Sequence, residues 1–214
     1  MAAWFKRSGG DERAPAPVAA RAALPPEGVA PTRAFPKFLT ALAQRESPVI
    51  VDFGPVIGSN VSFFGERLGC KIFVEDLFAD VERHARDGKR AALAEFFQTR
   101  LTQEDASIDG VLCWDLFDFL DRPAAIVLAG RISRMVRQGG AVFGYFGASA
   151  AELKHYTKFV VHGETELRTR PYQATPTTRQ VLQNRDIIKM FDPLTVAESF
   201  LLKSNTRETL FRRL

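Results

Sequence analysis

The chain has 214 residues, of which 46% are hydrophobic and 25% are charged, and its formal net charge is +4. This composition is typical of a globular protein and excludes a wholly disordered chain. Basic residues are scattered among acidic ones, and the sequence contains no basic block of the kind that follows a nucleic-acid backbone.

Targeting signals are not recognisable in the sequence. No apolar run approaches the roughly 20 residues that a membrane helix needs, so no transmembrane segment is expected. Lys6 and Arg7 are followed by polar residues, which argues against a signal peptide. Cys70 and Cys113 lie in or beside apolar runs and match no metal-ligand spacing. Two buried thiols fit a reducing compartment, so we expect a cytoplasmic protein.

The first 34 residues differ in composition from the rest. They are rich in Ala, Pro and Arg, and their prolines interrupt any helix. We therefore expect a flexible tail over 1–34 and a single α/β domain over 35–214. Trp4 and Phe5 at the tip of the tail could contact a protein partner or a membrane surface, although a disordered end is the simpler expectation.

The first part of the domain predicts a βαβ unit. A short helix over 36–45 precedes a β-branched run at 49–53, which is typical of a strand buried on both faces. A glycine turn follows, and then a helix that ends near Leu68 with Gly69 as its stop and Ser59 or Asn60 as its cap. The second strand is predicted at 71–74, and the crossover between the strands is expected to be right-handed.

The middle of the domain continues the alternation with one gap. Residues 77–101 predict helix divided by Gly88, and no third strand is recognisable there, although a doubly wound fold requires one. A strand at 108–114 follows, and after it the sequence predicts a helix over 122–137, a Gly139-Gly140 turn and a strand at 141–146.

The last part of the domain predicts antiparallel structure. Its expected elements are a hairpin formed by 158–161 and 166–170, a helix that starts at Thr177 or Thr178, and an antiparallel pair at 197–202 and 208–212. The predicted fold class is therefore α/β, with a doubly wound Rossmann-like sheet that is mostly parallel and has an antiparallel C-terminal edge hairpin.

The chemistry is predicted at the first glycine turn. A glycine turn from a strand into a helix lets backbone N–H groups approach a ligand, and the helix N-terminus favours negative charge. Asp52, Gly54 and Gly58 form this turn, and Asp76 lies 22 residues after Gly54. That spacing is close to the roughly 20 residues at which an acid meets the hydroxyls of a ribose.

Four motifs in order resemble those of class I S-adenosylmethionine-dependent methyltransferases. They span about residues 45–214 and read VDFGPVIG at 51–58, VEDL at 74–77, ASIDGVLCWDL at 106–116 and MVRQGGAVF at 135–143. The resemblance implies S-adenosylmethionine as the cofactor and a small molecule or a protein as the methyl acceptor. The glycine-rich motif is divergent, because Val56 stands where the family usually has a glycine.

The resemblance also implies roles for residues. Asp52, Gly54 and Gly58 would line the methionine end of the cofactor, and Glu75 or Asp76 would hold the ribose hydroxyls, with Asp76 favoured by register. Trp114, Asp115 and Leu116 would face the cofactor and the entering substrate. The acid that contacts adenine has no clear counterpart, and Gln98 is a weak substitute.

Methyl transfer depends mainly on proximity and orientation, and a base is needed only where the nucleophile must lose a proton. No catalytic triad is visible. His155 and Tyr156 are weak candidates near the substrate entrance, whereas His84 and His162 are expected at the surface.

Two further patterns have simpler explanations. Asp115, Asp118 and Asp121 suggest a magnesium site or, more simply, the polar side of a short helix, so no metal is expected. A group of arginines suggests an acidic substrate or nucleic acid, but aromatic residues are not interleaved with them beyond Tyr172, so nucleic acid is not expected; these arginines are Arg168, Arg170, Arg179 and Arg185.

Three functions remain open on the sequence. The first is methyl transfer to an unknown acceptor. The second is a non-catalytic methyltransferase-like module for interaction or scaffolding, which Val56 and the missing third strand favour. The third is a nicotinamide-dependent oxidoreductase, which the poor match of the turn to GxGxxG disfavours.

Overall fold

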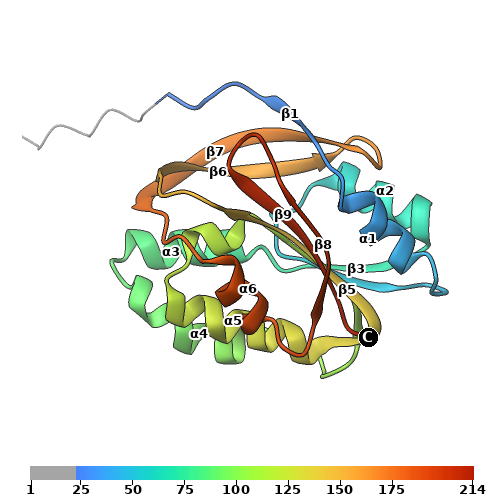
Figure 1. The fold of residues 1–214 in the computed structure, drawn as a ribbon. Helices are drawn as coiled ribbons and strands as arrows, with labels where there is room; N and C mark the ends of the chain where they lie inside the picture. Colours follow the sequence, from blue (N-terminus) through green and yellow to red (C-terminus); the bar gives the residue numbers. More distant parts are fainter. Residues whose placement is uncertain (1–22) are drawn as a thin grey trace, which may run out of the picture.

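The structure is a computed structural model, and it describes residues 23–214. Trp4, Phe5 and the first part of the predicted tail lie outside the described residues, so the predicted partner contact at the tail stays a prediction. Two sheets and the helices around them form the molecule (Figure 1).

The larger sheet has six strands in the order β3-β2-β4-β5-β9-β8. The first four strands of this order pair in parallel, whereas β9 pairs antiparallel with β5 and with β8. The expected fold class is therefore confirmed, including the antiparallel C-terminal hairpin. The strand bounds are β2 (Val49–Asp52), β3 (Lys71–Val74), β4 (Ile108–Trp114), β5 (Val136–Gly147), β8 (Thr195–Leu201) and β9 (Thr206–Arg212).

Helices cover both faces of this sheet. Figure 1 shows two of them on one side, α1 (Phe35–Leu42) and α2 (Gly58–Leu68). The others lie on the opposite side and are α3 (Leu77–Arg86), α4 (Leu93–Arg100), α5 (Arg122–Met135) and α6 (Asn184–Met190). The central strands β2 and β4 are buried on both faces, as their continuous apolar runs predict, whereas the edge strand β3 is only partly buried. Within residues 23–214, no helix has the length and apolar character needed to cross a membrane.

A second sheet lies across the carboxyl ends of the parallel strands, and we call it the roof. It consists of β1 (Gly28–Pro31), β7 (Glu166–Thr178) and β6 (Glu152–Val161), in that order and all antiparallel. The side chain of Asn60 links α2 to the roof through two hydrogen bonds of 2.8 Å. Its amide nitrogen donates to the carbonyl of Phe159, and its amide oxygen accepts from the N–H of Val161. Figure 1 shows β6 and β7 above the larger sheet.

Several predicted boundaries are wrong in the roof. β1 falls inside the predicted tail, so ordered structure begins before Phe35. The hairpin was predicted over 158–170, but its first strand starts earlier, at Glu152, and its second strand ends later, at Thr178. The two strands pair along this whole length. Thr177 and Thr178 end β7 instead of starting a helix, and the helix begins later, at Asn184.

Other differences concern glycines and caps. Gly139 and Gly140 lie inside β5 at an irregular register with β4, and Gly139 has φ +78°, so the expected turn is a distortion within the strand. The N-cap of α2 is Ile57 without a side-chain hydrogen bond, which replaces the predicted caps. Gly69 stops this helix in the left-handed conformation, as predicted. The residues between β3 and β4 form helices, so the gap at the third strand is confirmed.

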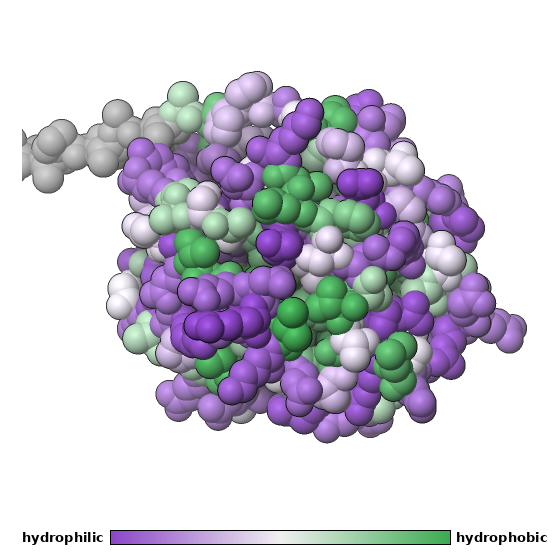
Figure 2. Space-filling view, viewed as in Figure 1, coloured by the Kyte–Doolittle hydropathy of each residue, from purple (hydrophilic) through white to green (hydrophobic). Residues whose placement is uncertain are grey.

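Apolar side chains also reach the surface. Figure 2 shows them gathered in patches among polar residues on the face viewed. Val29 of β1 and Leu201 of β8 are both exposed and line one groove beside the roof.

Candidate functional site

The candidate site lies where the order of the parallel strands reverses. β2 has β3 on one side and β4 on the other, and ligands of open α/β sheets bind outside the carboxyl ends at such a switch point. The parallel register sets Asp52 beside Val74 of β3 and beside Leu112 of β4. The segments that follow these three strands therefore leave the sheet side by side.

Asp52 is the buried acid of this site and is only 3% exposed. Its Oδ1 accepts hydrogen bonds from the N–H of Gly54 at 2.8 Å and from Nε1 of Trp114 at 2.6 Å. Burial raises the pKa of Asp52 to about 6, although both hydrogen bonds oppose this change, and the negative charge of Asp76 adds to it.

Trp114 fills the space above the glycine turn. A Cβ atom at Gly54 would lie 3.0 Å from the indole of Trp114, so the two residues are in close contact. The indole also stacks on Phe159 of the roof, with centroids 5.1 Å apart and planes at 6°. The backbone of Trp114 has φ +50°, a left-handed conformation that is uncommon for a bulky residue and costs about 1–3 kcal/mol.

The outer half of the turn is open. A Cβ atom at Gly58 would meet nothing within 4 Å, and Val56 is 70% exposed. The valine that replaces the family's glycine therefore lies at the surface. Because no side chain caps α2, its first N–H groups stay available to a negatively charged group.

The two candidate ribose acids have different surroundings. Glu75 is engaged by Arg100, whose Nη1 donates to it at 2.7 Å, and by Gln103. Asp76 caps α3 by accepting from the N–H of Ala79 at 3.2 Å, and it has φ +35°. Burial is the main cause that raises the pKa of Asp76 above its usual range. The expectation that Asp76, rather than Glu75, would meet a ribose stays a prediction.

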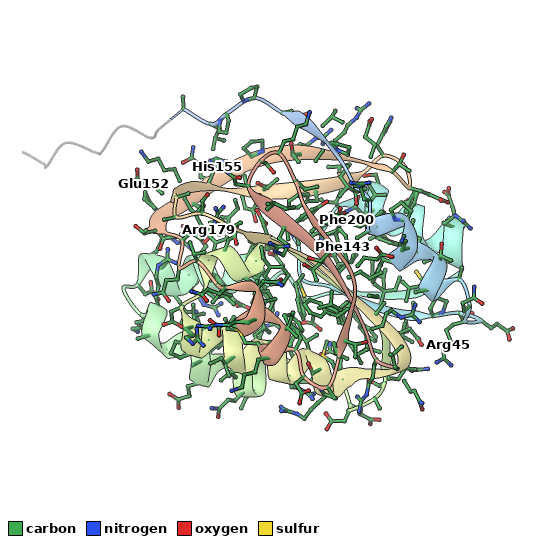
Figure 3. The ribbon with its side chains drawn as sticks, viewed as in Figure 1. Arg45, Phe143, Glu152, His155, Arg179 and Phe200 are labelled. Atoms are coloured by element: carbon green, nitrogen blue, oxygen red, sulfur yellow. The ribbon has the colours of Figure 1, made fainter. Side chains whose placement is uncertain are left out.

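A cavity of about 370 Å³ lies between the roof and the ends of β4 and β5. Figure 3 labels two of its lining residues, His155 and Arg179, at the same end of the molecule. Phe159 also lines it, and since Phe159 stacks on Trp114, this aromatic pair separates the cavity from Gly54. Polar lining residues further include Asp115, Asp118, Tyr145, Thr157 and Thr169.

His155 and Tyr156 point to opposite sides of β6, as neighbours on a strand do. Tyr156 is fully buried, donates to Glu82 at 3.1 Å and packs against Phe78. Tyr156 therefore connects β6 to α3 and does not line the cavity that His155 lines. Burial, together with the negative charge of Glu82, raises the pKa of the Tyr156 hydroxyl above its usual value.

The three aspartates after β4 do not meet. Asp118 pairs with Arg179 at 2.9 Å, Asp121 caps α5 through the N–H of Ala124 at 2.9 Å, and Asp115 faces the cavity. The part of the chain from 23 to 214 holds no group of three or more acidic, histidine or cysteine side chains that would suit a metal ion.

The arginines that suggested an acidic partner are likewise dispersed. Arg170 pairs with Glu27 and Arg185 with Asp186, whereas Arg179 is largely buried in the cavity wall. His84 and His162 make local contacts, to the carbonyl of Asp80 and to the guanidinium of Arg168.

Reasoning from the sequence missed the pair Asp118–Arg179, Tyr145 and Asn60. A single acid within the apolar run LFDFL was the only local signal for Asp118. Nothing near Arg179 in the sequence indicates its partner, because the two residues lie far apart in the chain.

Comparisons with known proteins gave only structural similarity. No family model matches the chain, and no curated protein matches it. Solved structures with a similar course of the chain include several S-adenosylmethionine-dependent methyltransferases.

Three of these structures illustrate the similarity. A 1,6-didemethyltoxoflavin-N1-methyltransferase from Burkholderia thailandensis, with bound 1,6-didemethyltoxoflavin and S-adenosylhomocysteine, is 16% identical over 85% of this chain and 77% of that one, with a TM-score of 0.49. A methyltransferase from Clostridium acetobutylicum is 12% identical over 83% and 91%, with a TM-score of 0.45. The CcbJ methyltransferase from Streptomyces caelestis is 13% identical over 85% and 95%, with a TM-score of 0.47.

Proposed function

We propose that this chain binds S-adenosylmethionine at the switch point and transfers its methyl group to an acceptor held beneath the roof. The observation that supports the proposal most is the juxtaposition of three features at neighbouring strand ends. They are the acid and glycine turn after β2, the uncapped N-terminus of α2, and Asp76 after β3.

The outer residues of the site fit the cofactor. The uncapped N-terminus of α2 at Gly58 suits a carboxylate, and the Asp76 carboxylate suits the hydroxyls of a ribose. Above Gly54, the indole of Trp114 occupies the space that the methionine end would need. The proposal therefore requires Trp114 to move aside.

When bound, the cofactor would supply a methyl group already activated by a sulfonium. The chain would orient the acceptor and exclude water, which are the contributions that proximity catalysis requires. The roof is suited to the second task, because Phe159 is buried on the side of β6 that lines the cavity.

The position of Trp114 also favours a second candidate, a non-catalytic methyltransferase-like module. In that case the indole would fill the former cofactor space permanently, and the Trp114–Asp52 hydrogen bond would be purely structural.

Calorimetric titration with S-adenosylhomocysteine distinguishes the two candidates. Binding at or below millimolar concentration supports the first, and its absence supports the second. Asp76→Asn is an informative variant, because asparagine still caps a helix but lacks the carboxylate, and we expect it to weaken binding about tenfold. Glu75→Gln is the matched control and should leave binding nearly unchanged, because Glu75 faces Arg100.

The nicotinamide alternative needs its own measurement. Titration with NADH should leave the fluorescence of both cofactor and protein unchanged.

A further inference from the structure

The cavity beneath the roof has the size of a small-molecule site. Its volume of about 370 Å³ lies in the range of about 300–1,000 Å³ that is usual for such sites. Flat apolar surfaces come from Phe159 and Pro171, and the rings of Phe159 and Tyr145 stack on each other at 5.2 Å. These walls are suited to a ring.

An ion pair between Arg179 and Asp118 forms part of the cavity wall. Arg179 donates to Asp118 at 2.9 Å and to the carbonyl of Ser149 at 3.0 Å, and Asp118 also accepts from the N–H of Gly147 at 2.7 Å. A Cβ atom at Gly147 would overlap the guanidinium of Arg179, so the absence of a side chain at this position leaves room for Arg179. The two charges cancel, and little of either side chain is exposed.

Asp115 is the unpaired carboxyl group of the cavity wall, where the hydroxyl of Tyr145 and Nε of Arg179 are further buried polar atoms without a hydrogen-bond partner among residues 23–214. It lines the cavity and forms no ion pair within residues 23–214, and its buried Oδ1 has no hydrogen-bond partner there. Buried polar atoms nearly always have a partner, so an exception beside a cavity points to a bound group. Burial, together with the charge of Asp118, raises the pKa of Asp115 to about 8, so the carboxyl is mostly neutral at pH 7.

We propose that this cavity binds a neutral, ring-bearing small molecule whose N–H or O–H group donates a hydrogen bond to Asp115. A cation would be balanced only by an ionised Asp115, whose buried charge is costly, and an anion would compete with Asp118 for the guanidinium of Arg179. The inference deepens the proposed function and rests on it in one respect, namely that this molecule would be the methyl acceptor. Binding itself requires no cofactor.

The test uses four probes that share one ring and differ in charge or donor. Benzamide is neutral with N–H donors, acetophenone replaces its NH₂ by a methyl group, benzoate is an anion, and benzylamine is a cation at pH 7. Binding to the full chain without cofactor is measured by NMR titration, with backbone shifts of Thr157 and Thr169 reporting the location. We expect benzamide to bind most tightly, about fivefold or more ahead of acetophenone.

Variants assign the contact. Asp115→Ala should weaken benzamide about fivefold or more, whereas Asp115→Asn, which stays neutral and can hydrogen-bond, should bind within about twofold of the original chain. Glu152→Gln on the exposed end of β6 is the control and should change nothing. Thermal unfolding checks that each variant is folded.

The proposal is overturned if benzoate or benzylamine binds most tightly, if acetophenone equals benzamide, or if benzamide does not shift the cavity resonances. Titration with S-adenosylhomocysteine is separate, so a failure there would remove the methyl-transfer role while leaving the binding site intact.

Discussion

The indole nitrogen of Trp114 lies 2.6 Å from Oδ1 of Asp52 and donates a hydrogen bond to it across the strand ends. Both residues are almost completely buried. The bond gives a partner to the carboxyl group of the glycine turn, and it holds the indole over Gly54. Access to the turn therefore depends on one side chain and one hydrogen bond.

Removal of this side chain should increase affinity for S-adenosylhomocysteine. Trp114→Ala opens the space above Gly54, and we expect the Kd measured by calorimetry to fall about fivefold or more, because the ligand no longer has to displace the indole. Truncation of a buried tryptophan costs about 3–5 kcal/mol, so Trp114→Phe, which loses the N–H but retains a ring, is the milder companion variant.

Fluorescence supplies an independent readout of the same movement. The chain has two tryptophans, so a Trp4→Phe background leaves Trp114 as the only one. Saturation with S-adenosylhomocysteine should shift its emission as the indole leaves its buried position. Tight binding with unchanged emission would show that the indole does not move.

The stability of the protein should depend on pH through Asp115. Its carboxyl has an ordinary pKa of 3.8 and a pKa of about 8 in the folded chain. The folded state therefore holds the proton more tightly, and stability is lost as the pH rises from about 4 to about 8. Asp115→Asn cannot ionise, so its advantage in free energy of unfolding should grow by a few kcal/mol over this window, since each pKa unit corresponds to about 1.4 kcal/mol.

Urea unfolding at pH 4, 6 and 8 measures this difference. Asp121→Asn serves as the matched control, because Asp121 caps α5 and asparagine caps equally well. A constant advantage of Asp115→Asn at all three pH values would show that Asp115 ionises normally.

A methyl group at Gly147 should disturb the cavity wall. Gly147→Ala places its Cβ against the guanidinium of Arg179, and we expect about 1–3 kcal/mol of destabilisation by chemical denaturation. Gly130→Ala is the control, because a Cβ there meets nothing within 4 Å and alanine favours the α5 helix by about 0.5–1 kcal/mol. Equal effects of the two changes would contradict the assigned contact.

The attachment of the roof should depend on Asn60. Asn60→Ala leaves the carbonyl of Phe159 and the N–H of Val161 without their partner, at a cost of about 1–3 kcal/mol for each buried group. Amide hydrogen exchange should become faster at Val161 and its neighbours in β6. Ser59→Ala, at an exposed neighbouring position, should leave the exchange rates unchanged.

The backbone of the larger sheet was predictable because its signals are local. The β-branched run at 49–53, the stop at Gly69 and the gap before Ile108 each depend on a few consecutive residues. All three appear in the structure, where the strand is Val49–Asp52. The antiparallel ending was predictable for the same reason, since two apolar runs flank a short polar turn.

The interior of the candidate site was less predictable because it depends on side-chain directions. Trp114 was expected to face the cofactor. The residues next to it in the sequence do not indicate that its indole covers Gly54 or that it stacks on Phe159, 45 residues later. The pairing of Asp118 with Arg179 and the depth of Tyr156 depend on tertiary packing in the same way.

The position of β1 has a consequence for the order in which the protein is made. Thr32, just after this strand, hydrogen-bonds Glu208, which lies 176 residues later in the chain. During synthesis from the N-terminus, β1 has no strand to pair with until β7 has emerged, and the hydrogen bond of Thr32 to Glu208 must wait for β9. Closure of the roof is therefore a late, non-local event, and a ribosome-bound chain that stops short of Glu208 should leave this segment open to proteases.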